Sequence, residues 1–343
     1  MKHAAITGIG GQDGTYLARS LLLRGYEVHG LLQFPFDREE PALRRRYPAD
    51  EFAAIRWTTG SLEDPFSLVR FLKSARPDEI YHLAGLTDSR QSFLVPEESV
   101  LSITLGTLRL LEAAREFCPA ARIFLASSAE VFGAPIETPQ CETTLMKPVT
   151  PYGIAKLAAD QFGRLHREKY SQFVAIGNLY NHESPLRPPN YLSRRLSLGV
   201  AAIKRGEAKE LQLGDLTAER DWSDARDIVN AMWLSLQANQ PGDYVFASGT
   251  QKTVADFVAA AFHTAGLDYR EFVKTTTRTN QQQQVASGLC GNPRKAETEL
   301  GWKRTWSFDT MVADLVRAEL ENRSEVERAN PSAVAGSTLR SHD

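Results

Sequence analysis

The chain has 343 residues, of which 42% are hydrophobic and 24% charged, and its formal net charge at pH 7 is −2. This length and composition allow two domains with ordinary globular cores. The near-neutral charge excludes any electrostatic argument for nucleic acid or an anionic membrane as a partner, and no apolar run approaches the ~20 residues that span a bilayer. The three cysteines are odd in number and far apart, which predicts neither a disulfide framework nor a metal site. The first residues read as a strand rather than a signal peptide, so we expect a cytoplasmic protein.

Short strand-like runs alternate with amphipathic helical segments through the first half of the chain. The strands are predicted at Ala4–Thr7, Glu27–Leu32, Glu79–Leu83 and Ile123–Ala126. The helices are predicted at Tyr16–Arg24, Pro65–Ala75, Val100–Phe117 and from Pro151 to about Tyr170. Alternation of this kind is typical of a parallel sheet with helices on both faces. We therefore predict a doubly wound α/β fold.

The second half of the chain is less regular. Strands are expected at Phe173–Leu179, Leu211–Gly214 and Asp243–Ala247. Helices are expected at Tyr191–Arg205, Asp227–Gln237, Thr253–Ala265 and Phe308–Leu320. From about Asn322 to Asp343 the sequence is polar and lacks a hydrophobic period, which predicts a disordered tail. The remainder predicts a smaller α/β lobe assembled from separate segments.

A glycine-rich loop lies between the first predicted strand and the first helix. Gly8, Gly11 and Gly14 have G-x-x-G-x-x-G spacing and enclose Gln12 and Asp13. Glycine allows the tight turn, the approach of backbone N–H groups to a pyrophosphate and close packing of helix on strand. In this βαβ context the loop predicts a Rossmann-type site for a dinucleotide.

The choice between NAD and NADP stays open. An acidic residue at the end of the second strand favours NAD and an arginine favours NADP, whereas Gln33 and Phe34 supply neither. Asp37 or Arg38 could reach the ribose. The run from Arg44 to Arg46 could meet a 2′-phosphate, but we favour a solvated helix face for it.

Four side chains in one short stretch carry the predicted chemistry. Tyr152 and Lys156 are four residues apart, so a helix places both on one face and the ammonium lies beside the phenol. This proximity favours the phenolate by lowering a pKa that is ordinarily about 10. Such a tyrosine can take a proton from a hydroxyl while a nicotinamide takes hydride. Ser128 and Glu130 precede the pair, and Glu130 supplies a second base, which alcohol oxidation alone would not need.

Several motifs together resemble the extended short-chain dehydrogenase/reductase superfamily and, more narrowly, the GDP-mannose 4,6-dehydratases. The resemblance covers roughly residues 1–320. It rests on I-T-G-I-G-G-Q-D-G-T-Y-L-A, E-I-Y-H-L-A, P-Y-G-I-A-K, N-H-E-S-P and G-D-L-T-A-E-R-D-W. It implies a homodimer built through the helices predicted at Val100–Phe117 and Pro151–Tyr170, as in relatives. It also implies a discontinuous dinucleotide-binding domain at residues 1–178 and 224–250 and a sugar-nucleotide domain at 179–223 and 251–321.

The resemblance implies a role for each candidate residue. Tyr152 takes the C4 hydroxyl proton of the sugar, Ser128 hydrogen-bonds the same oxygen and Lys156 holds the nicotinamide ribose. Glu130 then removes the C5 proton, water leaves from C6, and hydride returns there to give a 4-keto-6-deoxy sugar nucleotide. The cofactor-binding set is Gly8, Gly11, Gln12, Asp13, Gly14, Leu62, Leu83 and Ala84, with Tyr152 and Lys156. The substrate-binding set is Thr87, Arg90, Asn181, Arg194 and Arg220.

The sequence departs from the family pattern around the expected pocket. Paired arginines are absent near Gln33 and Phe34, so both NADP preference and a tetramer stay open. The family's S-H-V is Thr87-Asp88-Ser89 here, and Gln282 lies in a glutamine run where the resemblance leads us to expect a pyrophosphate-binding arginine. The residues around the expected pocket differ from the family pattern, whereas the catalytic residues match it. We therefore predict that the substrate is GDP-mannose or a related sugar nucleotide.

Other activities compete with dehydration. A sugar-nucleotide decarboxylase, 5,6-dehydratase or 4-epimerase shares the C4 oxidation, and Arg90 could meet a substrate carboxylate. Glu130 argues against a simple 4-epimerase, which needs no base at C5. A non-catalytic dinucleotide sensor is disfavoured because Ser128, Tyr152 and Lys156 are all present.

Overall fold

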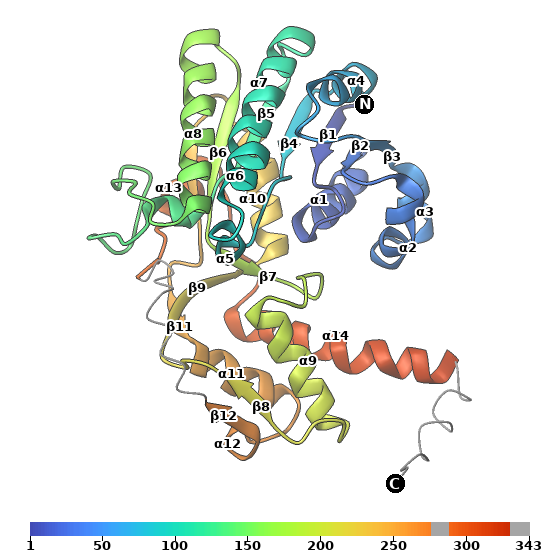
Figure 1. The fold of residues 1–343 in the computed structure, drawn as a ribbon, viewed down its shortest axis with the longest axis vertical. Helices are drawn as coiled ribbons and strands as arrows, with labels where there is room; N and C mark the ends of the chain where they lie inside the picture. The colour runs from blue at the N-terminus through green and yellow to red at the C-terminus, as the bar shows by residue number, and fades with distance from the viewer. Residues whose placement is uncertain (276–287, 330–343) are drawn as a thin grey trace. The chain divides into compact units, whose positions relative to one another are not determined.

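The computed structural model describes residues 1–275 and 288–329 (Figure 1). The chain divides into two compact units. Among the described residues, the first unit holds 1–182, 219–252 and 288–306, and the second holds 183–218, 253–275 and 307–329. Both units are therefore assembled from separated stretches of chain.

The first unit is built on a seven-stranded sheet in which every neighbouring pair is parallel. In spatial order the strands are β10 (Asp243–Phe246), β6 (Val174–Leu179), β5 (Arg122–Ala126), β4 (Glu79–His82), β1 (His3–Thr7), β2 (Glu27–Leu32) and β3 (Arg56–Thr59). The central strands are buried on both faces, which explains their nearly continuous apolar sequences. The chain order reverses between β1 and β4, and ligands of parallel α/β sheets bind at such a reversal.

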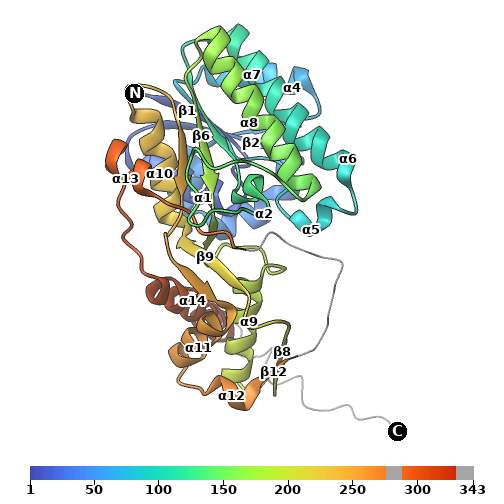
Figure 2. The same cartoon turned by 90° about the vertical axis from the view of Figure 1, so that its left-hand side faces the viewer.

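Helices cover both faces of this sheet, as Figure 2 shows. One face carries α4 (Pro65–Ala75), α7 (Gly106–Phe117) and α8 (Pro151–Tyr170); the other carries α1 (Gln12–Leu23), α10 (Ala225–Gln237) and α13 (Arg294–Glu299). Each face has its own buried apolar cluster. The predicted doubly wound α/β fold is confirmed.

The second unit is smaller and mainly helical. Its helices are α9 (Leu192–Lys204), α11 (Val254–Thr264), α12 (Tyr269–Phe272) and α14 (Phe308–Ala329). Thr253 and Asp256 form a reciprocal capping box that begins α11. The strands β8 (Leu211–Leu213) and β12 (Val273–Thr275) pair in parallel. A separate three-stranded sheet, which lies mainly in the first unit, contains β11 (Gln251–Thr253), β9 (Glu219–Asp224) and β7 (Asn181–Glu183).

Several elements differ from the sequence prediction. The first helix begins at Gln12 rather than Tyr16, because the end of the glycine loop already forms its first turn. The helix expected from Val100 begins with a π-helical segment, Val100–Leu105, before α7. Elements that were not predicted are α2 (Phe36–Arg46), α3 (Ala49–Ala54), β3, α5 (Ser89–Ser92), α6 (Pro96–Ser99), the 3-10 turn Ala129–Phe132, β7, β9, β11, α12, β12 and α13. Most of these are short, and short segments carry little periodicity.

Two boundaries also differ. Residues 288–306 belong to the first unit, although they were assigned to the sugar-nucleotide domain. Trp302 explains this, since its buried ring packs edge-on against Phe246 of β10 at 5.6 Å between centroids. Helix α14 runs to Ala329, beyond the predicted end of its helix at Leu320, and the disorder expected of the tail stays a prediction. The rest of the predicted tail lies outside the described residues.

No helix within residues 1–275 and 288–329 combines the length and apolar character needed to cross a membrane.

Candidate active site

The glycine loop lies at the reversal point of the sheet, directly after β1. Gly8 has φ +76°, and a Cβ there would lie 2.9 Å from the backbone N of Ala84, which follows β4. A Cβ at Gly14 would lie 2.3 Å from the carbonyl O of Gly8. These two positions therefore require glycine, because the loop packs against its own backbone and against the segment after β4.

The other predicted cofactor residues surround this loop. The amides of Leu83 and Ala84 both donate to Thr7 Oγ1 at 3.2 Å, which fixes the segment after β4 beside the end of β1. Leu62 follows β3 and is 9% exposed, and its side chain packs against Gly106 at the start of α7. The structure thus places Leu62, Leu83 and Ala84 after parallel strands, at the same edge of the sheet as the glycine loop.

The N-H-E-S-P motif is attached to the glycine loop. Gln12 Nε2 donates to the carbonyl O of His182 at 3.2 Å, and His182 Nε2 lies 2.9 Å from Asp13 Oδ2. The other ring nitrogen of His182 lies 2.7 Å from the carbonyl O of Tyr180 and can only donate there. His182 therefore supports the predicted cofactor residues Gln12 and Asp13, a role that neither motif alone revealed.

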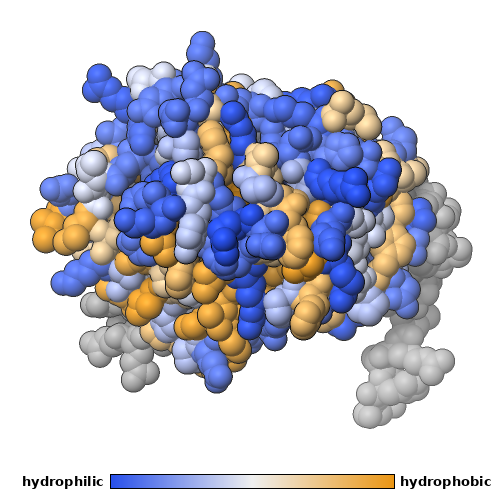
Figure 3. Space-filling view, turned by 90° about the horizontal axis from the view of Figure 1, so that it is seen from above, coloured by the Kyte–Doolittle hydropathy of each residue, from blue (hydrophilic) through white to orange (hydrophobic). Residues whose placement is uncertain are grey.

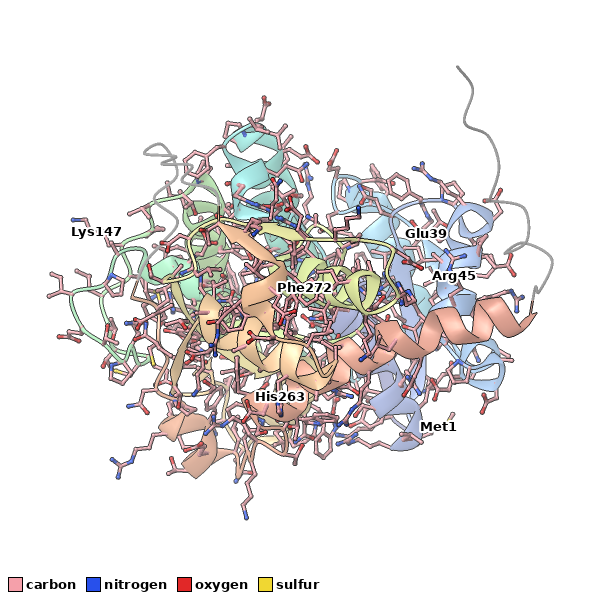
Figure 4. All side chains as sticks on the ribbon, turned by 90° about the horizontal axis from the view of Figure 1, so that it is seen from below. Met1, Glu39, Arg45, Lys147, His263 and Phe272 are labelled. Carbon is pink, nitrogen blue, oxygen red and sulfur yellow. The ribbon has the colours of Figure 1, made fainter. Side chains whose placement is uncertain are left out.

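The arginines after β2 do not all lie on a solvated face. Arg44 pairs with Glu40 at 2.7 Å, and Arg45 is exposed (Figure 4). Arg46, by contrast, is partly buried and donates through Nη1 to the carbonyl O of Gly10 at 2.5 Å. The solvated-face interpretation is therefore wrong for Arg46. Nearby, the Arg38 guanidinium stacks over the Phe34 ring at 4.0 Å.

Helix α8 presents Tyr152 and Lys156 on one buried face, as the spacing predicted. Pro151 occupies the first turn, and Thr150 caps the helix by accepting from the Gly153 amide at 3.0 Å. Lys156 Nζ lies 5.7 Å from the centroid of the Tyr152 ring and donates to the carbonyl O of Ala126 at 2.6 Å. Burial lowers the pKa of Lys156 to about 8, so its ammonium group titrates close to neutral pH.

Ser128 and Glu130 lie in the turn that follows β5. The backbone N–H of Glu130 donates to Ser128 Oγ at 3.2 Å. The Glu130 carboxylate accepts from Ser89 Oγ at 2.6 Å and from Thr150 Oγ1 at 2.8 Å. Because Thr150 also caps α8, it joins the Glu130 carboxylate to the helix turn that contains Tyr152.

Asp160 extends the same helix face by one further turn. It is buried and accepts from Ser127 Oγ at 2.6 Å, while Ser127 Oγ accepts from Asn178 Nδ2 at 3.3 Å. Burial raises the pKa of Asp160 to about 7, and its negative charge raises the pKa of Lys156. Asp160, Ser89 and Thr150 were not predicted as site residues. Asp160 could have been predicted from its spacing, because Tyr152, Lys156 and Asp160 follow one another at four-residue steps and so share one face of the helix.

The predicted substrate-binding residues are more scattered. Thr87 and Asn181 are exposed in the first unit, and Arg90 pairs with Asp88 at 3.4 Å. Arg220 donates to the carbonyl O of Glu219 at 2.6 Å. Arg194 belongs to the second unit, where it pairs with Glu319. The glutamine run that includes Gln282 lies outside the described residues.

Comparison with known proteins identifies the family. The family model described as GDP-mannose 4,6 dehydratase matches residues 5–315. GDP-mannose 4,6 dehydratase 1 of Arabidopsis thaliana is 38% identical over 93% of this chain and 90% of its own length. The chain belongs to the GDP-mannose 4,6-dehydratase family. The resemblance predicted from sequence is confirmed.

Solved structures agree with this family's fold. The dTDP-glucose 4,6-dehydratase DesIV from Streptomyces venezuelae, solved with NAD, has a TM-score of 0.79 at 23% identity and covers 94% of this chain and 98% of its own. The protein RMD from Pseudomonas aeruginosa, solved with NADPH, has a TM-score of 0.77 at 20% identity, covering 94% and 100%. At these identities the likeness concerns the fold.

Replacing Asp160 by Asn should move the alkaline limb of the activity–pH profile to lower pH. The aspartate raises the pKa of Lys156, so its removal lets the ammonium lose its proton at lower pH. The amide can still accept from Ser127. The profile of kcat/KM between pH 6 and pH 10, roughly the range in which lysine titrates, measures the effect.

Ser127→Ala is the matched control, since it removes the hydrogen bond but keeps the charge. It should leave the alkaline limb nearer its original position than Asp160→Asn does. An unchanged limb in Asp160→Asn would show that this carboxylate does not act on Lys156.

Proposed function

We propose that this protein is a nucleotide-sugar 4,6-dehydratase, using a bound nicotinamide dinucleotide to convert GDP-mannose or a related sugar nucleotide to its 4-keto-6-deoxy product. Membership of the family confirms the predicted enzyme class, an NAD(P)-dependent carbon–oxygen lyase. The observation that carries the proposal is the Glu130 carboxylate, which Thr150 joins to the first turn of the helix that carries Tyr152 and Lys156. A base fixed there serves elimination, not alcohol oxidation alone.

The residues around the glycine loop fit such a cofactor. Gly8 and Gly14 leave no room for a side chain, and Gln12, Asp13, Leu62, Leu83 and Ala84 surround them. When bound, the nicotinamide supplies reversible hydride transfer. In our proposal the first unit holds this cofactor and the second unit contributes to binding of the sugar nucleotide.

Each catalytic side chain has a distinct proposed task. Tyr152 takes the proton from the C4 hydroxyl, and Lys156 favours the phenolate through its positive charge. Ser128 hydrogen-bonds the C4 oxygen. Once C4 is a ketone, the C5 proton becomes acidic; Glu130 removes it, and the departing C6 oxygen takes up a proton to leave as water. Ser89 and Thr150 orient the Glu130 carboxylate through their hydroxyl groups.

The sugar-nucleotide substrate is proposed from the predicted substrate-binding residues and from the family. The proposed substrate contacts are Thr87, Arg90, Asn181, Arg194 and Arg220. The three arginines suit a diphosphate, because a guanidinium group can bind it through two parallel hydrogen bonds. Arg194 already pairs with Glu319, so a diphosphate would compete with that carboxylate. GDP-mannose, the substrate in the family's name, is the first sugar nucleotide to test. A cytoplasmic location stays a prediction.

Glu130→Gln should abolish water loss while leaving C4 oxidation possible. Loss of a general base costs about 10²- to 10⁴-fold in rate, and glutamine can still accept from Ser89 and Thr150. The measurement is mass spectrometry of products from a panel of GDP-, CDP-, UDP- and dTDP-sugars, with cofactor reduction followed by absorbance. Tyr152→Phe is the comparison, because it should suppress both steps.

The same panel separates the competing activities. Loss of water supports the dehydratase and names the sugar. Loss of carbon dioxide from a uronic acid substrate would support a decarboxylase, and isomerisation alone would contradict the role given to Glu130.

We further propose that the cofactor is NADP. Two guanidinium groups lie near the end of β2: Arg38 stacks on Phe34, and Arg46 binds the Gly10 carbonyl of the glycine loop. An arginine in this region suits a 2′-phosphate. Arg38→Gln should weaken NADP binding about tenfold and leave NAD binding unchanged. Titration of both dinucleotides by fluorescence measures this, with the exposed Arg45→Gln as control. Equal binding losses for NAD and NADP would contradict the assignment.

We also propose a homodimer formed through α7 and α8. Exposed apolar side chains lie along and beside these helices: Val100, Phe117, Ile154, Leu165 and Tyr170. Figure 3, which looks onto the ends of α7 and α8, shows hydrophobic atoms gathered at the surface along the lower edge of the view. A face of this kind favours association.

Leu165→Glu should convert the dimer to a monomer in size-exclusion chromatography at micromolar concentration. Leu165 is 41% exposed on α8, and a charge there would be desolvated at an interface. The control is Leu145→Glu, which places the same charge on a 76% exposed leucine outside the two helices. A monomeric parent protein would contradict the proposal directly.

A further inference from the structure

Three potential metal ligands meet at the edge of the sheet opposite the glycine loop. His3 is the first residue of β1, and Glu27 and His29 lie on the neighbouring strand β2. In the parallel pairing His3 is opposite Glu27, and Ala5 is opposite His29. Residues two apart on a strand point to the same face, so all three side chains project from one face of the sheet.

Their donor atoms are close together. One ring nitrogen of each histidine and one carboxylate oxygen all lie within 4.8 Å of one another. His29 Nε2 lies 2.9 Å from Glu27 Oε1, and the two imidazole rings are stacked at 6.1 Å between centroids with 16° between their planes. It is the one such group found in the part of the chain that the structure describes.

The surroundings hold these donors in place. His3 Nδ1 lies 3.3 Å from the carbonyl O of Ala75, where it can only donate, so the lone pair of the neutral ring lies on Nε2. The backbone N–H of His3 donates to Asp78 Oδ2 at 2.7 Å. His29 is 3% exposed, whereas His3 and Glu27 are partly exposed. Contacts inside the first unit thus hold His3 in place, and solvent can reach the group through His3 and Glu27.

We propose that His3, Glu27 and His29 form a binding site for a divalent transition-metal ion, with zinc as the first candidate. Two imidazoles and one carboxylate are a ligand set that zinc accepts, with water completing a tetrahedron. Magnesium and calcium prefer oxygen donors and are disfavoured. The ion takes the position of the proton that His29 and Glu27 now share.

One cation already competes for this position. Arg56 Nε lies 2.9 Å from Glu27 Oε1, but the Arg56 side chain is 67% exposed and can turn into solvent. Metal binding must displace this contact, so Arg56 lowers the affinity of the site. A variant without this charge should therefore bind metal more tightly, a result that an incidental cluster would not produce.

The site is separate from the proposed catalytic groups. Strand β1 has five residues, so its first residue lies roughly 13 Å from its last, which precedes Gly8. An ion bound here joins β1 to β2 at their beginnings. Its effect is stabilisation of the first unit, because a ligand that binds only the folded state raises the unfolding midpoint.

The test is a zinc titration of the untagged, EDTA-treated full chain by calorimetry and thermal unfolding. We expect one zinc ion per chain and an unfolding midpoint several degrees higher, reversed by EDTA. His3→Gln and Glu27→Gln should each weaken zinc binding at least tenfold, and Arg56→Gln should strengthen it. His263→Gln, which removes an exposed histidine outside the group (Figure 4), should bind zinc like the parent protein.

Two results would overturn the site. One is zinc binding that persists unchanged in both His3→Gln and Glu27→Gln, which places the ion elsewhere. The other is the absence of binding in the parent chain and in Arg56→Gln alike. Circular dichroism shows whether each variant is folded. If Glu27→Gln fails to fold, a folded His3→Gln protein that no longer binds zinc still supports the site.

Discussion

The attachment of helix α8 to the end of strand β5 is the constraint on which the proposed chemistry depends. Three hydrogen bonds make it, one at the residue that caps the helix and two at residues within the helix. Thr150 binds the Glu130 carboxylate, Lys156 binds the Ala126 carbonyl, and Asp160 binds the Ser127 hydroxyl. Because these contacts lie in buried or half-buried surroundings, each is strengthened by the low local dielectric and is costly to break. They hold a helix and a turn in one relative position, as the roles proposed for Tyr152 and Glu130 require.

A second constraint positions the cofactor loop. The parallel sheet reverses its strand order between β1 and β4, and ligands of such sheets bind at this reversal. Thr7 fixes the distance between them by accepting from the amides of Leu83 and Ala84. The N-H-E-S-P motif then reaches the same loop through His182. Parts that are distant in sequence thus meet at this edge of the sheet, the segment after β4 held by Thr7 and the N-H-E-S-P motif held by the glycine loop.

The buried charges around α8 carry an energetic cost that fits a functional interpretation. A lysine and an aspartate in full burial are both shifted toward their neutral forms, and their mutual attraction offsets part of this cost. An apolar pair would stabilise the helix as well. Groups that exchange protons near neutral pH are, however, what acid–base chemistry needs. Asp160 therefore belongs with Lys156 as a positioning residue, although no contact with substrate is assigned to it.

The sequence by itself determined the fold class, the main strands and helices, the glycine loop and the Tyr152–Lys156 pair. These follow from local rules: burial on two faces makes strands apolar, and a four-residue step places side chains on one helix face. The tertiary structure alone decided which hydroxyl groups hold Glu130, where Arg46 points, and that residues 288–306 pack into the first unit. It also brought His3, Glu27 and His29 together, since only strand pairing relates residues of β1 to those of β2. Contacts between distant segments depend on register and packing, and neither leaves a periodic signal along the chain.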